Sequence, residues 1–157
     1  METLVPAPAC RHSRLRVETG RPAEFIDITG RIQETVAEAG VRDGLVNVQT
    51  MHTTTAVLVN EHEPLLLLDF AALLARLAPE HGAYRHDDMA ARTVNVSPGE
   101  RPNGHAHCRA LFMPSSASLN IFDGRLQLGR WQRIFLVELD GPRSRELSVL
   151  VLGQSAH

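Results

Sequence analysis

Apolar and polar residues alternate near both ends of the chain, with the period of two that is typical of half-buried strands. Leu15 and Val17 alternate with charged residues near the start, and residues 147–152 form an apolar run near the end. Further short runs are rich in apolar and β-branched residues, as strands are. They lie at residues 25–28, 45–50, 56–59, 119–122, 125–128 and 131–139. The pattern therefore predicts a protein built mainly of strands.

Three segments carry helical signals instead. Residues 29–40 repeat apolar residues at helical spacing between Thr29, a suitable N-cap, and a final glycine. Residues 65–77 are strongly apolar and lie between two prolines. Residues 104–112 follow Asn103, which is suited to cap a short helix. Such a helix would turn its two histidines to different faces.

Turn signals join these elements at short intervals. Asp-Gly pairs stand at residues 43–44 and 123–124, and residues 140–143 are also typical of a turn. Residues 80–102 predict a long loop, a kind of segment that is usually functional or mobile. Strands joined by tight turns favour antiparallel pairing. The predicted class is α+β, with antiparallel, sandwich-like sheets and two or three helices.

Composition and length narrow the picture further. The 157 residues suit one domain, with residues 1–13 expected as a flexible tail and residues 14–157 as the single domain. A net charge of −2 and few aromatic residues argue against a nucleic-acid partner. The longest apolar run, residues 65–68, is too short to span a membrane. Two cysteines and no signal-peptide pattern predict a cytoplasmic protein with reduced thiols.

The basic residues are all arginine, sixteen in number, and the chain contains no lysine. A Schiff-base lysine, a phosphate-loop lysine and a lysine general base are therefore excluded. Arginine remains to bind anions, and its planar guanidinium holds carboxylates and phosphates at two points. An arginine-based anion site is thus compatible with this composition.

Histidines provide the main candidate chemistry. His105 and His107 lie close together, His86 lies beside Asp87 in the long loop, and His52 begins a run of threonines. Three or four neutral imidazoles match the ligand number of a catalytic divalent metal, most naturally zinc, if the fold brings them together. The same groups could act instead as acid, base and phosphate ligands without a tightly bound metal.

A carboxylate and an arginine near residue 140 add a second candidate. Glu138 ends an apolar strand-like run, so its carboxylate could reach a pocket, and Arg143 in the following turn is a candidate anion anchor. A serine hydrolase is less favoured because the chain has no nucleophile elbow. A cysteine nucleophile would depend on Cys108 alone.

These motifs together make the chain resemble the secondary thiamine-phosphate synthase (YjbQ-like) family. The resemblance spans about residues 14–153, and its most specific part is Leu-Gly-x-Trp-Gln followed by Asp-Gly-Pro-Arg. The matching residues are His52, Thr53, Thr54, Asn60, Glu61, Asp69, Pro79, Tyr84, His86, Asp87, Asn103, His107, Gly124, Leu126, Leu128, Gly129, Trp131, Gln132, Glu138, Asp140, Gly141, Pro142, Arg143 and Arg145.

The resemblance implies a YjbQ-like fold, a small cytosolic protein and a homotrimer. The activity it implies is a weak, secondary thiamine-phosphate synthase activity. That reaction joins hydroxymethylpyrimidine diphosphate to thiazole phosphate and releases diphosphate. The implied partners are small phosphorylated metabolites, and the implied cofactor is a divalent metal, zinc or magnesium.

The resemblance also implies the roles of particular residues. The expected catalytic residues are His86, His107, Glu138 and Arg143. The expected substrate-binding residues are Thr53, Thr54, Asn60, Glu61, Asn103 and Gln132. The expected metal ligands are His52, His86 and His107.

Two other functions stay open on the sequence, and enzyme activity itself is left undecided. One is a metal- or phosphometabolite-binding protein whose catalysis is incidental, and the other is a metal-dependent hydrolase. The chain departs from the family pattern at Met113, Asn120 and His105, which border the expected site. These departures bear on substrate preference more than on fold.

Overall fold

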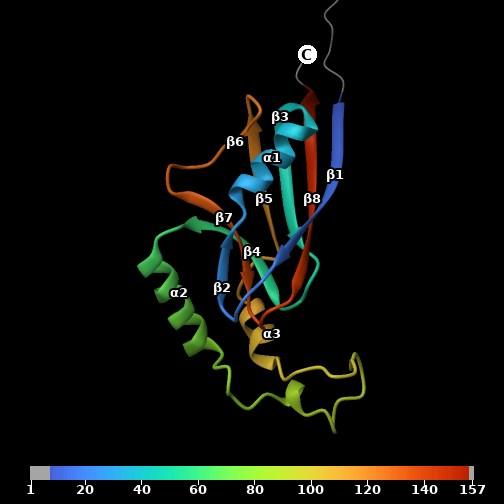
Figure 1. The fold of residues 1–157 in the computed structure, drawn as a ribbon, viewed down its shortest axis with the longest axis vertical. Helices are drawn as coiled ribbons and strands as arrows, with labels where there is room; N and C mark the ends of the chain where they lie inside the picture. Colours follow the sequence, from blue (N-terminus) through green and yellow to red (C-terminus); the bar gives the residue numbers. More distant parts are fainter. Residues whose placement is uncertain (1–7, 156–157) are drawn as a thin grey trace, which may run out of the picture.

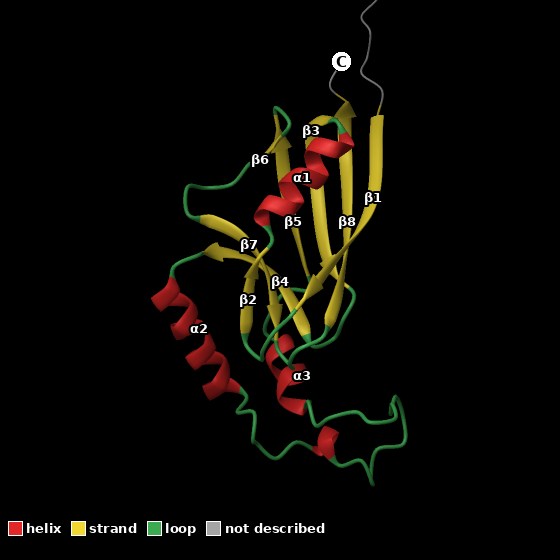
Figure 2. Cartoon of the chain, viewed as in Figure 1, coloured by secondary structure: helices red, strands yellow, loops and turns green. Residues whose placement is uncertain are grey.

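The computed structural model describes residues 8–155, which form two antiparallel sheets and three α-helices (Figures 1 and 2). The strands are β1 (Pro8–Glu18), β2 (Glu24–Asp27), β3 (Val41–Thr50), β4 (Thr55–Glu61), β5 (Ser116–Phe122), β6 (Arg125–Leu126), β7 (Gln132–Glu138) and β8 (Ser144–Ser155). The helices are α1 (Thr29–Ala39), α2 (Pro64–Leu77), α3 (Gly104–Ala110) and a single 3-10 turn, η1 (Arg85–Asp87). The predicted α+β class is confirmed.

The larger sheet has the strand order β1-β8-β3-β5-β6, and the smaller one β2-β7-β4. Every neighbouring pair is antiparallel. The predicted hairpin at residues 119–128 is confirmed as β5 and β6, with positive φ at both Asp123 and Gly124. A two-residue turn of that kind suits the twist of a hairpin.

The smaller sheet is buried on both faces, and this makes β7 the centre of the fold. Ile134 and Leu136 pack with α1 and the larger sheet, in one apolar core. Phe135 and Val137 point the other way, into a second core with Leu74 of α2 and residues of α3. Because successive side chains of a strand face opposite sides, one apolar run serves both cores.

The helix ends lie close to the predicted ones, but the N-cap of α1 is not the predicted residue. Gly40 ends α1 in the left-handed conformation, as expected of a C-cap glycine. Thr29 is not the N-cap: Ile28 occupies that position, and the Thr29 hydroxyl accepts a hydrogen bond from the Ile134 amide at 2.8 Å. The threonine therefore fastens α1 to β7 instead of capping the helix. Glu63 caps α2 by accepting from the Leu65 and Leu66 amides.

The expected tail is a strand from Pro8 onward, and residues 1–7 of that prediction lie outside the described residues. β1 pairs with β8 along its whole length, from Pro8 opposite Gln154 to Glu18 opposite Ser144. Backbone hydrogen bonds hold this edge strand, whose first six residues are mostly exposed. The first residues of β1 therefore lack the alternation of apolar and polar side chains that predicts a strand.

The turn expected at residues 43–44 is also wrong, because both residues lie inside β3 next to a register shift. Gly44 faces Gly153 of β8, and the two backbones approach closely there. A Cβ on Gly44 would lie 2.1 Å from the Leu152 carbonyl oxygen. Glycine is needed at this crossing for space, whereas the sequence suggested it was needed for a turn.

Helix α2 leaves much of its apolar surface exposed. Leu65, Leu68, Leu73 and Leu77 are exposed, and Leu74 is the buried residue of the helix. In Figure 2 this helix runs along the outside of the smaller sheet. No helix in residues 8–155 is long and apolar enough to cross a membrane.

We expect Gly44→Ala to destabilise the protein, because the new methyl group must push β3 away from β8. Overpacking of this kind costs about 1–3 kcal/mol in the free energy of unfolding. Gly30→Ala is the matched control, since a Cβ at Gly30 in α1 meets nothing within 4 Å. That change should stabilise the helix by up to about 1 kcal/mol. Chemical denaturation measures both; equal effects of the two substitutions would contradict the close crossing.

Candidate functional site

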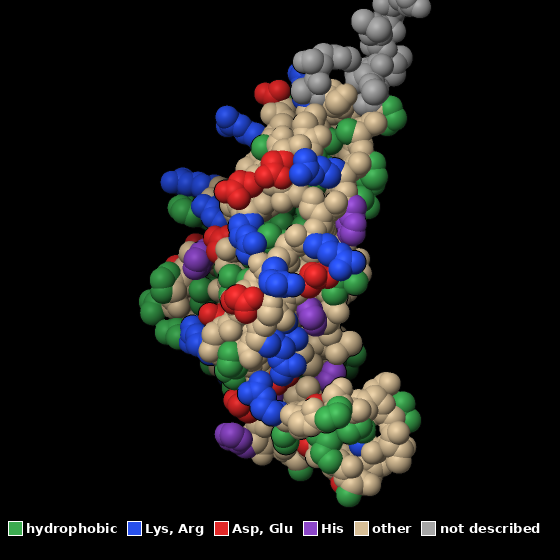
Figure 3. Space-filling view, turned by 45° about the vertical axis from the view of Figure 1, so that its right-hand side comes forward, with side chains coloured by type: hydrophobic (Ala, Val, Ile, Leu, Met, Phe, Trp, Pro, Cys, Tyr) green, Lys and Arg blue, Asp and Glu red, His purple; other side chains and the backbone are tan. Residues whose placement is uncertain are grey.

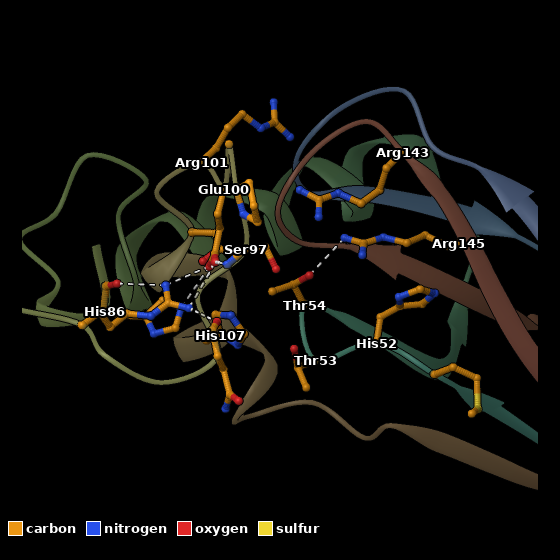
Figure 4. A pocket seen from close by; sticks show the side chains of 16 residues that line it. His52, Thr53, Thr54, His86, Ser97, Glu100, Arg101, His107, Arg143 and Arg145 are labelled. Atoms are coloured by element: carbon orange, nitrogen blue, oxygen red, sulfur yellow. Dashed lines mark hydrogen bonds and ion pairs between the residues drawn. The ribbon is translucent and has the colours of Figure 1, made fainter. Parts of the chain in front are cut away.

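A polar cavity of about 600 Å³ opens where the β3–β4 turn, the start of β8 and the segment of residues 86–107 meet (Figure 4). Seven of the expected site residues line it. They are His52, Thr53, Thr54, His86, Asn103, His107 and Arg143. Figure 3 shows arginine and histidine side chains distributed along the drawn face, with acidic side chains between them. The structure therefore brings together residues that are up to 91 positions apart in sequence.

A buried ion pair forms the base of this site. Arg145 and Glu138 are 2% and 0% exposed at their side chains, and Arg145 Nε and Nη2 each lie 2.6 Å from a different Glu138 oxygen. The amides of Asp140 and Gly141 also donate to Glu138 Oε1, and the Thr19 hydroxyl donates to Oε2. Burial alone would raise the pKa of Glu138, but the hydrogen bonds from Arg145 and the two amides outweigh it and lower the pKa.

Glu138 is therefore not placed as the catalytic carboxylate that the sequence suggested. Both oxygens are already occupied, and the side chain does not line the cavity. What it holds in place is Arg145, whose Nη2 also donates to the Thr54 hydroxyl at 3.0 Å. The carboxylate thus orients two cavity residues, Arg145 and Thr54, from beneath.

A second carboxylate orients two more lining residues. Asp140, buried in the turn after β7, pairs with Arg143 and accepts from Asn103 Nδ2 at 3.4 Å. With its amide nitrogen turned to Asp140, Asn103 has an Oδ1 atom that is buried and has no hydrogen-bond partner in the described protein. Arg143 itself remains 40% exposed at the side chain and points into the cavity (Figure 4).

The helix that carries His107 begins at Gly104, as predicted, but the Asn103 side chain makes no capping hydrogen bond. Asp87 Oδ1 accepts from the amides of Asn103 and Gly104 at 2.9 and 2.8 Å. A carboxylate at a helix N-terminus is favourable because free amides and the helix dipole meet there. The loop thus supplies the cap of α3, and the Asn103 side chain is left to face the cavity.

The long loop is itself held by an arginine. Arg92 pairs with Glu100 at 2.8 Å and also donates to the carbonyl oxygens of His86 and Asn95. The hydrogen bonds from Arg92 keep the pKa of Glu100 below its ordinary value. These bonds tie residues 86, 95 and 100 together, so the loop has a fixed centre although it lacks strands and long helices.

His86 and His107 stand edge to face, with ring centroids 4.6 Å apart. Burial is the main cause that lowers the pKa of His107, and the neighbouring His86 lowers it further. His107 is therefore a neutral base at neutral pH. His86 Nε2 is buried without a hydrogen-bond partner and lies 3.9 Å from Glu100 Oε1. His105, on the opposite face of α3, is buried and does not line the cavity.

His52 lies on the other wall of the cavity and has a different environment. Its Nε2 atom accepts a hydrogen bond from the Glu146 amide at 2.9 Å. Burial and the nearby Arg145 lower the pKa of His52. The ring is therefore neutral, with its proton on Nδ1, and Nδ1 can act only as a donor.

The predicted three-histidine metal site is not assembled in this structure. Within residues 8–155, no group of three His, Cys, Asp or Glu side chains is placed to hold a metal ion. The physical reason lies in His52, because its acceptor nitrogen is already bound to a backbone amide. His86 and His107 remain as a pair of neighbouring nitrogen donors, one fewer than a catalytic zinc usually requires.

Three expected substrate-binding residues lie elsewhere. Asn60 and Glu61 end β4 opposite Arg133 and Gln132 of β7, whereas the cavity lies at the other end of these strands. Six residues of extended strand separate the two ends by about 20 Å. Gln132 closes the turn before β7 by accepting from the Gly129 amide. These three residues match the family pattern in sequence, but the structure does not place them at the cavity.

The structure adds three arginines that the sequence did not single out as site residues: Arg92, Arg101 and Arg145. Arg145 did carry a readable signal. It is in phase with Leu147, Val149 and Val151, the inward-facing side of β8. A charge in the buried phase of a strand needs a partner. Arg92 and Arg101 carried no such signal, because side chains in a loop do not alternate regularly between inward and outward positions as those of a strand do.

Comparisons with known proteins agree over nearly the whole chain. The family model described as "UPF0047 protein YjbQ-like" matches residues 13–154. A "UPF0047 protein" of Archaeoglobus fulgidus is 38% identical, over 88% of this chain and 98% of that protein. One from Methanothermobacter thermautotrophicus is 34% identical, over 89% and 90%. The crystal structure of a YbjQ-like protein of unknown function from Sulfolobus solfataricus has a TM-score of 0.82, with 30% identity, over 94% of this chain and 100% of that one.

We expect Glu138→Gln to lower the free energy of unfolding by about 3–5 kcal/mol, because it leaves the Arg145 guanidinium buried without its charged partner. The double variant Glu138→Gln/Arg145→Met should recover part of this loss, since it removes both charges. Denaturant titration of the two variants and the parent tests the pair. A double variant that is less stable than Glu138→Gln would contradict this account.

The lowered pKa values of His52 and His107 predict a dependence of stability on pH. The unfolded chain binds protons near the ordinary histidine pKa, and the folded protein binds them only at lower pH. Stability is therefore full above that ordinary value and is lost as the pH falls through the folded pKa values. His52→Gln should make this loss shallower between about pH 7 and about pH 5. Denaturation across this range measures it, and identical slopes would refute the histidine contribution.

Proposed function

The chain belongs to the UPF0047 protein YjbQ-like family, and we propose that its cavity binds small phosphorylated metabolites as a cytoplasmic enzyme. For the reaction we propose the thiamine-phosphate synthase type. Hydroxymethylpyrimidine diphosphate and thiazole phosphate are joined, and diphosphate is released. The choice of these two substrates rests on the sequence resemblance, whereas the choice of a phosphorylated ligand rests on the cavity.

The observation that carries the proposal is the arginine content of the cavity wall. Four arginines line it, Arg92, Arg101, Arg143 and Arg145, but only one carboxylate, Glu100, does. Arg101 has no ion-pair partner among the described residues, and Arg143 is partly exposed although Asp140 holds it. Guanidinium groups bind phosphate oxygens at two points, and oriented donors cost little reorganisation when the anion binds.

In the proposed reaction these residues bind and neutralise the leaving diphosphate. The carbon–oxygen bond to the diphosphate breaks, and its electron pair leaves with the phosphate oxygen. The lone pair of the thiazole nitrogen forms the new carbon–nitrogen bond. Arg101 and Arg143 would stabilise the charge that develops on the leaving group. Thr53 can donate from the β3–β4 turn, and neutral His107 can accept or return a proton.

A divalent ion, zinc or magnesium, remains part of the proposal only as an ion that could accompany a phosphorylated substrate. Magnesium is usually bound in this way, by few protein ligands together with substrate phosphates. His86 and His107 provide two nitrogen donors, which supports no complete protein site. The described residues therefore give no step of the reaction to a metal.

A phosphometabolite-binding protein with incidental catalysis is the second candidate. The same arginines support it, because the proposed reaction consists largely of positioning and charge neutralisation. A metal-dependent hydrolase is supported less, since three protein ligands are not gathered. We also propose self-association, as a trimer by resemblance. The exposed leucines of α2 support it, because apolar patches on a surface are often interfaces.

The test of the anion site is the binding of inorganic diphosphate to Arg101→Met, measured by calorimetry. Loss of one guanidinium contact should weaken binding about tenfold or more. Arg31→Met is the matched control: Arg31 is an exposed arginine of α1, away from the cavity, and its loss should leave affinity unchanged. No binding to the parent protein, or equal effects of both substitutions, would overturn the anion site.

The test of the reaction is complementation of a strain that lacks thiamine-phosphate synthase. The parent and His12→Ala should restore growth, while His107→Ala should not. His12 is an exposed residue of β1 that bonds to Ser148, and neither residue lines the cavity. If the chain binds diphosphate but never restores growth, the binding protein is the correct alternative.

A further inference from the structure

A second cavity adjoins the arginine-lined one. It has a volume of about 520 Å³ and lies between the β3–β4 turn and the C-terminal end of α3. Met51, His52, Thr53 and His107 line both cavities, so these residues form a shared wall. Figure 4 shows His52, Thr53 and His107 on the side of the first cavity opposite Arg101. The two hollows are therefore neighbours on one continuous surface.

The two cavities differ sharply in charge. Four arginines and a glutamate line the first cavity. Among the described residues that line the second cavity, none is an arginine, aspartate or glutamate. Its two histidines both have lowered pKa values because they are partly buried, and so they are neutral at neutral pH. An anionic group thus finds cationic partners in the first cavity and none among the described residues that line the second.

Apolar side chains line part of the second cavity, and two of them, Leu111 and Met113, do not line the arginine-lined cavity. Met51, Leu111 and Met113 line it, and Met51 and Leu111 are 57% and 80% exposed. Met113 packs at its other side against the second apolar core, which holds it in place. Methionine thioethers pack favourably against aromatic rings and adapt to their outline. Small-molecule sites are typically of this kind, apolar with a few fixed polar groups.

We propose that the second cavity is a subsite for the uncharged ring of the ligand whose phosphate binds among the arginines. The subsite rests on the proposed anion site, because the phosphate fixes one end of the ligand. A ring on the carbon that bears the phosphate would pass between His52 and His107 to reach Met51 and Leu111. The ligand class is therefore a phosphate monoester of a planar, uncharged ring, and not a bare phosphate or a sugar polyphosphate.

The test compares phenyl phosphate with inorganic phosphate, by calorimetry at about pH 8, where both are mainly dianions. The parent protein should bind phenyl phosphate at least about tenfold more tightly, because only that ligand has a ring. Leu111→Ala should reduce this preference severalfold while leaving the affinity for inorganic phosphate unchanged, because Leu111 lines the second cavity and not the first. The Leu111 side chain is exposed, so the change should not impair folding.

Phe112→Ala is the matched control. Phe112 follows Leu111 directly and is 66% exposed, but it does not line either cavity. Its loss should leave the preference for phenyl phosphate intact. Solution mass is measured for each variant, since exposed apolar residues also serve interfaces between copies of a chain. A preference that changes only where the mass changes would overturn the subsite.

The remaining outcomes separate the two proposals. Equal affinity of the parent for phenyl phosphate and inorganic phosphate would overturn the subsite and leave the anion site standing. Binding of neither ligand would overturn both, since the ring has no anchor without its phosphate. A preference that Phe112→Ala removes as fully as Leu111→Ala would also overturn the subsite, because a residue outside the cavity would then carry it.

Discussion

The buried pair of Glu138 and Arg145 is the constraint on which the site depends. Two charges this deeply buried are tolerated only when their hydrogen bonds are satisfied, and here Glu138 accepts five hydrogen bonds, two from Arg145, two from backbone amides and one from Thr19. These contacts join the end of β7, the turn after it, the start of β8 and the end of β1. The same pair then fixes Thr54 at the cavity. One interaction therefore both links the strands of the fold and positions a cavity residue, so the strands hold this part of the site in place.

Much of the fold was predictable because it follows from local periodicity. The apolar runs of β4, β7 and β8 and the helical spacing of α1 and α2 show directly in the sequence. The failures at the start of β1 and at residues 43–44 have one cause. In both places the structure depends on the backbone of β8. It forms a hydrogen-bond ladder with β1, and at Gly153 it approaches Gly44 of β3 closely. A partner strand that lies more than 100 positions away leaves no mark on local pattern.

The site was predictable in its residue types and less so in its geometry. His52, His86, His107, Asn103 and Arg143 do converge, although no local spacing required it. The sequence could not predict which side-chain nitrogen and oxygen atoms already accept hydrogen bonds within the protein. His52 Nε2 accepts from a backbone amide, and both oxygens of Glu138 accept hydrogen bonds within the protein, so the lone pairs that a metal ion or a substrate proton would need are already engaged. Such commitments depend on distances that only the folded chain defines.

The hydrogen-bond and ion-pair partners of the cavity residues also indicate where the site can still bind a ligand. Three of the four lining arginines already face a carboxylate, which fixes their direction and reduces their net charge. Of the buried side-chain atoms in residues that line the cavity, Asn103 Oδ1 and His86 Nε2 have no hydrogen-bond partner in the described protein, and the exposed Arg101 has no ion-pair partner there. Burying a polar atom without a partner costs free energy, and the cost is recovered when a ligand supplies the missing bond. A cation, an amide oxygen and an imidazole nitrogen around one hollow favour a ligand that both accepts and donates hydrogen bonds. A bare anion would satisfy the arginine alone, whereas a phosphate ester that also carries a proton donor would satisfy all three.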